Sequence, residues 1–170
     1  SHGILVNTLS ESLGKNIYFV PRIYADELIK DDPYYLRDLG SVLNQRTKIF
    51  YCGKNVVSKN LTSFSKVNKI LGNEIIFWDN FYANYYCHRR FFIGPFTGRE
   101  KLKNIMINTT GLINTDLLIL DIFASSIKNK PSANEWLKIL NDHGVPKIFN
   151  KVKHFFLKPN FGSNPLPNSF

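Results

Sequence analysis

The sequence predicts an α/β fold in which parallel β-strands alternate with α-helices. Four short apolar runs, rich in β-branched and aromatic residues, have the length of buried strands, and amphipathic stretches of helical spacing accompany them. Hydrophobic residues make up 44% and charged residues 21% of the 170 residues, an ordinary balance for one globular domain with a packed core. We expect this domain to span residues 1–157, followed by a flexible tail rich in Pro, Asn and Gly over 158–170.

The first predicted unit is a strand followed by a helix. Residues 17–20 read Ile-Tyr-Phe-Val and end at Pro21, which predicts a buried strand. Asp32-Pro33 then predicts the start of a helix, because proline at the first helical position has no N–H that would need a partner. The apolar stripe of that helix consists of Leu36, Leu39, Val42 and Leu43.

Two further strands enclose a second helix. Residues 48–52 predict a strand that Gly53 ends, and residues 74–78 predict the next strand. Between them, the apolar spacing over residues 64–71 predicts a helix, and Gly72 is placed to cap its carboxyl end.

The last part of the chain holds one strand and two helices. Residues 104–108 predict the fourth strand. The apolar run 117–124 is long enough to favour a helix, with Thr115-Asp116 as its N-cap. Ser132 and Glu135 have the spacing of a capping box, so we expect another helix there, ended by Gly144.

Four strand–helix units are half of an eight-unit barrel. Parallel sheets are covered on both faces, and a half-barrel leaves its outer strands, 17–20 and 104–108, with unpaired edges. We therefore expect the isolated chain to self-associate, or a second polypeptide or an N-terminal half to complete the barrel.

The chain is strongly basic, but its charge is dispersed. It has 22 Lys and Arg against 13 Asp and Glu, a formal net charge of +9 and a pI near 9.6. The basic residues stand mostly alone, and the longest basic run is the pair Arg89-Arg90. Proteins that bind nucleic acids usually concentrate their charge on one helix or stripe, so we expect no nucleic-acid partner.

Other broad classes are disfavoured by what the sequence lacks. No apolar run approaches the roughly 20 residues of a membrane-spanning helix, and we expect no membrane partner. The first residues have no signal-peptide pattern, so we expect a cytoplasmic location. Cys52 and Cys87 are too few for a disulfide framework or a four-cysteine zinc site, which leaves a single bridge open. His88 has no second ligand at metal-binding spacing, so we expect no metal and no cofactor.

Polar residues follow every predicted strand, at the edge where parallel α/β folds place their sites. An aromatic ring beside carboxylate and amide groups is typical of a sugar site, because the ring packs on the pyranose and the polar groups bond its hydroxyls. The alternative is that Trp78 belongs to the core and that Asp79 or Asn80 caps the next turn. The polar residues at these strand ends are Tyr24, Asp26, Gly53, Lys54, Asn55, Trp78, Asp79, Asn80, Asn108, Thr109 and Thr110.

The segment 78–99, WDNFYANYYCHRRFFIGPFTGR, resembles the signature of glycoside hydrolase family 84, the O-GlcNAcase and bacterial β-N-acetylglucosaminidase family. That signature reads Trp-Asp-Asn, two variable residues, Ala-Asn-Asp-Tyr, a basic residue or pair, and then Gly-Pro and Gly-Arg. Residues 21–24, 51–53 and 106–108 resemble the ends of neighbouring strands in the family, Cys-Pro-Thr-x-Tyr, Trp-Thr-Gly and Leu-x-Asn. In all, residues 2–143 resemble strands five to eight of the family's TIM (β/α)8 barrel with their helices.

The resemblance implies a retaining enzyme that removes β-linked N-acetylglucosamine. The substrate's own acetamido oxygen is the nucleophile, one aspartate orients the acetamide, and an adjacent aspartate is the acid/base. In the family this pair ends the fourth strand, so we expect it upstream of Ser1 and expect this chain alone to be inactive. Asp31-Asp32 does not match the motif, and we interpret it as a helix cap before Pro33.

The match implies several contacts to the sugar. Tyr24 would bound the acetamido pocket, Trp78 would form its floor, and Asn80 would bond the acetamide or the glycosidic side. Asn108 would lie at the mouth of the last strand. The implied substrate-binding residues are Tyr24, Trp78, Asp79, Asn80, Asn84, Tyr85 and Asn108.

Tyr85 departs from the family pattern, which has aspartate at this position to bind the outer hydroxyls of the sugar. A phenol cannot supply the two acceptor oxygens of a carboxylate. The leading hypothesis is therefore part of a β-N-acetylglucosaminidase that binds an N-acetylglucosamine-containing glycan or glycoconjugate. The alternatives are a degenerate, non-catalytic sugar-binding or interaction domain, and a basic interaction module unrelated to sugar.

Overall fold

The structure is a computed structural model, and the secondary structure, burial and contacts below refer to the part of the chain that it describes. The described residues are 2–58, 64–84, 90–99, 102, 104–128 and 132–157.

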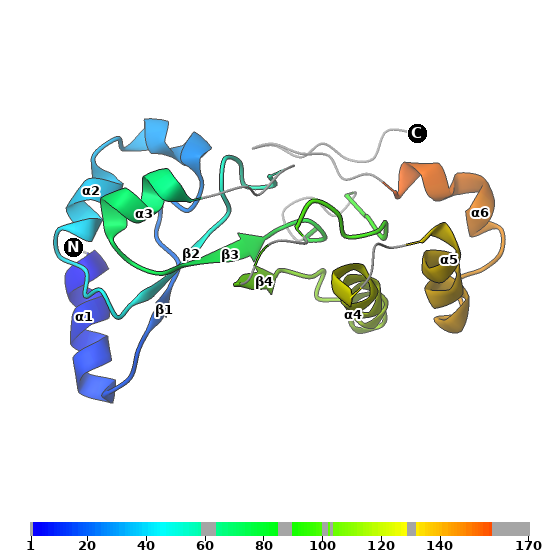
Figure 1. Ribbon diagram of the computed structural model, residues 1–170, viewed down its shortest axis with the longest axis horizontal. Coiled ribbons are helices and arrows are strands. Elements are labelled where there is room, and N and C mark those ends of the chain that lie inside the picture. The colour runs from blue at the N-terminus through cyan, green and yellow to red at the C-terminus, as the bar shows by residue number, and fades with distance from the viewer. Residues whose placement is uncertain are drawn as a thin grey trace.

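A four-stranded parallel sheet forms the centre of the fold, with its strands in chain order β1-β2-β3-β4 (Figure 1). The strands are β1 (Tyr18–Phe19), β2 (Lys48–Tyr51), β3 (Ile75–Asp79) and β4 (Ile105–Ile107). Each lies where the sequence predicts it, and β1 is shorter than the apolar run that contains it. The predicted α/β class and the parallel arrangement are confirmed.

Helices flank the strands along the chain. None of the helices in the described ranges is long and apolar enough to cross a membrane. The helices are α1 (His2–Leu13), η1 (Asp26–Asp31), α2 (Tyr35–Gly40), α3 (Ser65–Leu71), α4 (Ile113–Lys128), α5 (Ala133–Asp142), α6 (Phe149–Val152) and η2 (Lys153–Phe155), where η marks a 3-10 helix.

Three predicted helix boundaries are confirmed. Gly72 takes the left-handed conformation, φ +70°, and caps α3. Gly144 likewise has φ +71° just after α5. At the start of α5, the backbone N–H of Glu135 donates to Oγ of Ser132 at 3.1 Å, as the predicted capping box requires.

The predicted helix start at Asp32-Pro33 is wrong. A 3-10 helix, η1, comes first, and α2 begins at Tyr35 without a side-chain cap. The carboxylate of Asp32 accepts from Nη2 of Arg22 at 2.6 Å, so an ion pair occupies the group that was expected to cap the helix. Asp31 is the last residue of η1.

The predicted N-cap of the long helix is also wrong. α4 begins earlier than predicted, at Ile113, and Asp116 lies in its first turn. The carboxylate of Asp116 instead accepts hydrogen bonds from Thr109, Thr110 and Gly111 in the preceding loop, at 2.6 to 3.0 Å. Asp116 therefore fastens the loop after β4 to α4.

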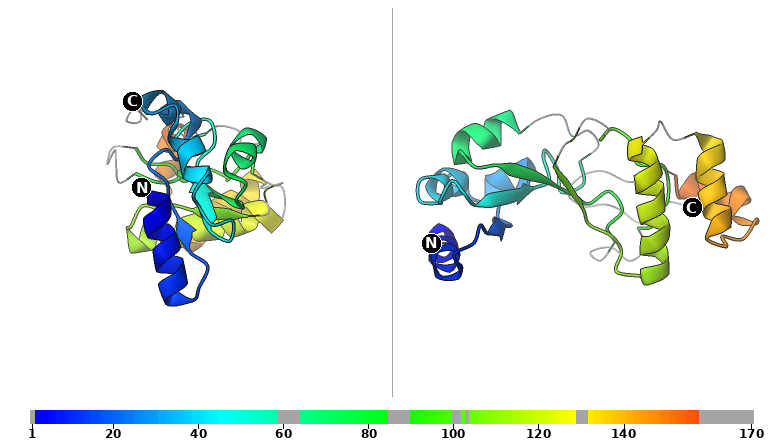
Figure 2. Two further views of the ribbon diagram at one scale, coloured as in Figure 1. Left: turned by 90° about the vertical axis from the view of Figure 1, so that its left-hand side faces the viewer. Right: turned by 60° about the horizontal axis from the view of Figure 1, so that its bottom comes forward.

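The hydrophobic core has two parts, one at each end of the sheet. The first part packs α1, α2 and α3 against one face of β1, β2 and β3, where Ile49, Tyr51 and Ile75 point inward. The second part joins α4 and α5 to the segment after β3, with Ile119 and Trp136 at its centre. Figures 1 and 2 show the first three helices beside one end of the sheet and α5 and α6 at the far end of the molecule.

The other face of the sheet is less completely buried by the described residues. Successive strand residues point to opposite faces, and the residues that alternate with the core are half-buried or exposed: Tyr18, Lys48, Phe50, Ile76, Trp78 and Met106. β1 and β4 are edge strands, as predicted. Within the described ranges, a parallel sheet that ends at β1 and β4 and has one incompletely buried face has the geometry of half a barrel.

Candidate functional site

Aromatic side chains gather where the strands end. The ring of Trp78, on β3, lies 5.8 Å from the ring of Tyr24, which follows β1, with an interplanar angle of 38°. The ring of Phe50, on β2, lies 6.3 Å from the ring of Trp78 in a T-shaped arrangement. Nε1 of Trp78 is buried and has no acceptor among the described residues. Trp78 and Tyr24, both half-buried, therefore form one aromatic surface at the carboxyl edge of the sheet.

The loops that follow β1 and β2 are joined by backbone hydrogen bonds. The N–H of Cys52 donates to the carbonyl of Tyr24 at 2.7 Å, and the N–H of Glu27 donates to the carbonyl of Lys54 at 3.1 Å. These bonds continue the β1–β2 pairing beyond the strands. They hold Tyr24 in place beside Trp78.

Glu27, which the sequence did not single out, fastens the loop after β2. Its carboxylate accepts from the backbone N–H of Val56 at 2.6 Å and from Nδ2 of Asn55 at 2.7 Å. Charge-assisted hydrogen bonds of this kind are short and strong. The sequence shows only that Glu27 is an acidic residue in a loop after a strand. Its role could not be predicted from that, because its partners lie almost 30 residues away along the chain.

The amides of Asn80 and Asn108 link the other strand ends. Nδ2 of Asn80 donates to the carbonyl of Val56 at 3.0 Å and to Sγ of Cys52 at 3.3 Å. Oδ1 of Asn80 accepts from Nδ2 of Asn108 at 3.0 Å. We call Glu27, Val56, Asn80 and Asn108 the amide chain. It crosses the carboxyl ends of all four strands.

Of its two asparagines, Asn80 is buried and Asn108 is half-buried. The side chain of Asn80 is only 2% exposed, and protein groups occupy both its nitrogen and its oxygen. Asn108 follows β4, and its backbone N–H donates to the carbonyl of Asp79 at 2.9 Å. The structure thus brings Tyr24, Trp78 and Asn108 to one rim and places Asn80 just behind it.

Asp79 lies under the rim in a buried ion pair with Arg99. Oδ2 of Asp79 is 2.7 Å from Nε of Arg99, and the backbone N–H of Phe81 donates to Oδ1 at 3.0 Å. Nη2 of Arg99 also donates to the carbonyl of Ser58, at 2.6 Å. The Asp79 carboxylate is therefore engaged by the protein itself.

Another buried arginine shapes the segment that carries Asn84. Arg90 is fully buried, and its guanidinium donates to the carbonyls of Phe81 and Ala83. Asn84 is itself buried. Tyr85, the predicted departure from the family pattern, lies outside the described residues.

These strand ends match a known family. A protein-family profile described as beta-N-acetylglucosaminidase matches residues 4–115, which include every residue of the rim. The chain belongs to this family. The predicted resemblance to family 84 is thereby confirmed.

Two named relatives of this β-N-acetylglucosaminidase-family chain are much longer than the region they share with it. The chain is 31% identical over 117 residues to the proteins named O-GlcNAcase of Rattus norvegicus and Mus musculus, an alignment that covers 61% of this chain and 13% of each relative. The chain thus spans a small part of these curated relatives.

A solved structure shares the fold. A mutant of the Thermobaculum terrenum O-GlcNAc hydrolase superimposes with a TM-score of 0.68 at 22% identity, covering 89% of this chain and 36% of that one. A match to about a third of a longer chain agrees with a partial barrel.

In this family member, the thiol of Cys52, which accepts from the Asn80 amide behind the rim, is unreactive at neutral pH. Cys52 is a free cysteine and is buried. Burial, together with the negative charges of Asp79 and Glu27, raises the pKa of the Cys52 thiol well above its ordinary value. The thiol therefore stays protonated at neutral pH and is a poor nucleophile. Elsewhere, no three His, Cys, Asp or Glu side chains gather as metal ligands within the described ranges.

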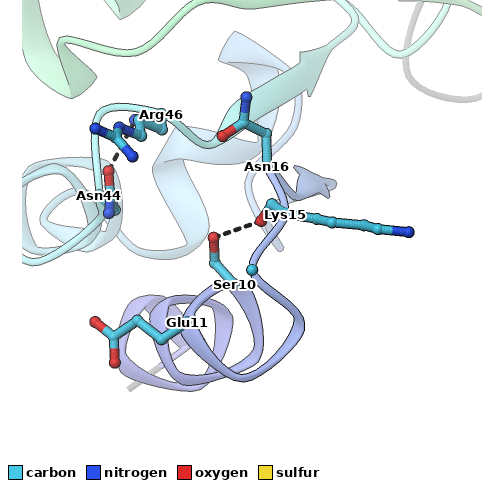
Figure 3. A pocket seen from close by; sticks show the side chains of 7 residues that line it. Ser10, Glu11, Lys15, Asn16, Asn44 and Arg46 are labelled. Carbon is cyan, nitrogen blue, oxygen red and sulfur yellow. Dashed lines mark hydrogen bonds between the residues drawn. The ribbon is translucent and has the colours of Figure 1, made fainter.

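A polar cavity lies at the opposite edge of the sheet. It measures about 220 Å³ and is formed where α1 leads into β1 and α2 leads into β2 (Figure 3). Residues that precede strands line it, whereas the rim is made of residues that follow them. The lining residues are Ser10, Glu11, Gly14, Lys15, Asn16, Asn44 and Arg46. This cavity is separate from the candidate site of the β-N-acetylglucosaminidase fold.

Proposed function

We propose that this chain is the carboxyl-terminal half of a β-N-acetylglucosaminidase catalytic domain and supplies part of its sugar pocket. The observation that carries the proposal is the rim, where the Tyr24–Trp78 aromatic surface lies on the same sheet edge as the half-buried amide of Asn108. An aromatic face packs on the apolar side of a pyranose, and an amide bonds its polar groups. The substrate class is a glycan or glycoconjugate with terminal N-acetylglucosamine.

The reaction we infer is retaining hydrolysis assisted by the substrate's acetamido group. In this proposal the residues of this chain bind and orient the sugar, and a pair of aspartates from the other half of the barrel performs proton transfer. The chain's own Asp31-Asp32 pair is a poor substitute, because Asp32 is paired with Arg22. We therefore expect no hydrolysis of aryl β-N-acetylglucosaminides by the chain alone, since general acid–base catalysis typically contributes 10²–10⁴-fold.

Completion of the barrel is part of the proposal. The less completely buried face of the sheet and the outer strands β1 and β4 support the docking of further strand–helix units. An amino-terminal half would cover this face and enclose the sugar between the two halves.

A sugar titration tests the pocket. We expect N-acetylglucosamine to shift the NMR signals of the Trp78 indole and the Asn108 side-chain amide. Because half a pocket leaves much of the sugar in water, the dissociation constant should be about millimolar, which corresponds to a binding free energy of about −4 kcal/mol. Trp78→Ala should abolish the shift of the Asn108 amide. The control Tyr34→Ala, which removes an exposed aromatic ring that is not part of the Tyr24–Trp78 pair, should retain the Asn108 shift.

Shifts confined to the polar cavity of Figure 3, or no shifts at saturating sugar, would contradict the proposed pocket. The second candidate function, a non-catalytic sugar-binding domain, is favoured by Tyr85 in place of the family aspartate. Sugar binding without hydrolysis, in a completed barrel that contains the aspartate pair, would support this second function.

A further inference from the structure

The amide chain has a fixed chemical direction. Nδ2 of Asn80 faces the carbonyl oxygen of Val56, which has no proton to give. If the amide of Asn80 were turned over, two oxygens would meet at 3.0 Å. The nitrogen of Asn80 must therefore point to Val56, and its oxygen must point to Asn108.

The same reasoning fixes Asn108. Because Oδ1 of Asn80 can only accept, Asn108 must offer it Nδ2, at 3.0 Å. The carbonyl oxygen of Asn108 then faces away from Asn80. No donor among the described residues bonds this oxygen, and Asn108 is half-buried at the rim. The free acceptor at the rim is thus determined by groups behind it.

The last acceptor of the amide chain is the Glu27 carboxylate. The N–H of Val56 donates to the carboxylate of Glu27 at 2.6 Å, and the carbonyl of the same residue accepts from Asn80 at 3.0 Å. Each donor in the series leads to the next acceptor, from Asn108 through Asn80 and Val56 to Glu27. The N–H and the carbonyl of Val56 belong to two different peptide groups, so Glu27 acts on this series by fixing the position of Val56. Asn80 is a single amide group, and its donation to the Val56 carbonyl makes its own oxygen a better acceptor.

We propose that Asn80 and Glu27 are positioning residues for Asn108. Asn80 orients the Asn108 amide, and Glu27 holds the Val56 backbone to which Asn80 donates, so that the carbonyl oxygen of Asn108 accepts from an O–H or N–H donor of the ligand. Asn80, in this assignment, acts through Asn108 and does not touch the sugar. The identity of the ligand rests on the proposed function, whereas the orientation of Asn108 does not.

Side-chain amide NMR of the full chain tests the orientation without any ligand. In the unmodified chain, the Asn108 amide protons should be well separated in chemical shift and should exchange with water at least tenfold more slowly than those of the exposed Asn44. Asn80→Ala should remove both signs of hydrogen bonding from Asn108. Glu27→Gln, which keeps the size of the side chain, should move the Asn108 signals in the same direction by a smaller amount.

A matched control lies at the amino ends of the strands, just before β3 and β4. There Nδ2 of Asn104 donates to the Glu74 carboxylate at 3.0 Å, the same kind of bond in a separate place. Glu74→Gln should shift the Asn104 signals and leave Asn108 unchanged. If Asn80→Ala fails to fold, the pair Glu27→Gln and Glu74→Gln decides alone. Unchanged Asn108 signals in folded Asn80→Ala or in Glu27→Gln would overturn the proposal.

A second measurement uses N-acetylglucosamine as the probe. Glu27→Gln should weaken its binding severalfold, and Glu74→Gln should not. Severalfold weakening supports the proposal, and unchanged affinity overturns the positioning role of Glu27. If the unmodified chain binds no sugar, the proposed function fails, while the amide signals still decide the orientation of Asn108.

Discussion

The carboxylate of Asp79 lies 2.7 Å from Nε of Arg99, and both side chains are almost completely buried beneath the rim. Arg99 also donates to the carbonyl of Ser58, so one guanidinium connects the end of β3 with the loop after β2. Asp79 in turn accepts the backbone N–H of Phe81 through its side chain and that of Asn108 through its carbonyl. This ion pair therefore supports the rim from beneath.

Breaking the pair should be costly. Removal of one partner leaves a buried, uncompensated charge, and we expect Arg99→Met to lower the free energy of unfolding by about 3–5 kcal/mol. Urea unfolding followed by circular dichroism measures this. The exposed pair Arg22–Asp32 provides the control, because Arg22→Gln should cost about 0–1 kcal/mol. Equal losses of unfolding free energy in the two variants would show that the buried Asp79–Arg99 pair contributes no more to stability than the exposed pair.

Asp116 should make stability depend on acidic pH. Burial raises the pKa of this carboxyl, but hydrogen bonds from Thr110, Thr109 and Gly111 outweigh it and hold the pKa below its usual value. The ionised form is thus favoured by folding. Its contribution is fully present above the unfolded pKa, near 3.9, and is lost as the pH falls through the lower folded value.

The comparison of the parent chain with Asp116→Asn between pH 2 and 6 tests this dependence. Asparagine keeps the shape of the side chain but cannot ionise. The parent chain should be more stable above about pH 4, and the difference should shrink as the pH falls. The exposed Asp38→Asn serves as the control. A difference that stays constant over the whole range would contradict the role of the Asp116 charge.

The ends of the half-barrel should drive self-association. Large apolar side chains are exposed on α1, the helix before β1, and on α4, the helix after β4, with Leu5 60% and Leu117 53% accessible. Free strand edges and exposed apolar surface favour association despite the +9 net charge. Sedimentation velocity should show dimers or larger species, reduced by Leu5→Glu or Leu117→Glu. Ile148→Glu, an exposed site next to α6, should change nothing, and a uniformly monomeric parent chain would contradict the prediction.

Tyr85 should limit sugar affinity in a completed barrel. A carboxylate can accept from two hydroxyls where a phenol presents one oxygen, so Tyr85→Asp should tighten binding of an N-acetylglucosamine analogue by about 1.5–3 kcal/mol. Calorimetric titration of both forms with an oxazoline mimic measures the change, and Tyr34→Asp controls for added charge. Equal or weaker binding by Tyr85→Asp would indicate a pocket adapted to tyrosine.

Local patterns in the sequence were sufficient for most of the secondary structure. The apolar runs that became β2 and β3, the left-handed Gly72 and the Ser132 cap each depend on residues within a few positions of one another. Where local rules failed, a longer contact was the cause. Asp32 does not cap α2, because Arg22, ten residues earlier, holds its carboxylate.

The sequence by itself also determined the family and the strand ends that form the rim, because the 78–99 motif and the parallel order place Tyr24, Trp78 and Asn108 at one edge. Only the tertiary structure decided what lies behind that rim. Glu27, Val56 and Asn80 meet across 24 to 29 residues of chain, and Arg99 reaches Ser58 across 41. Such contacts arise when strands pair and loops close over them, and no local period in the sequence records which donor will find which acceptor.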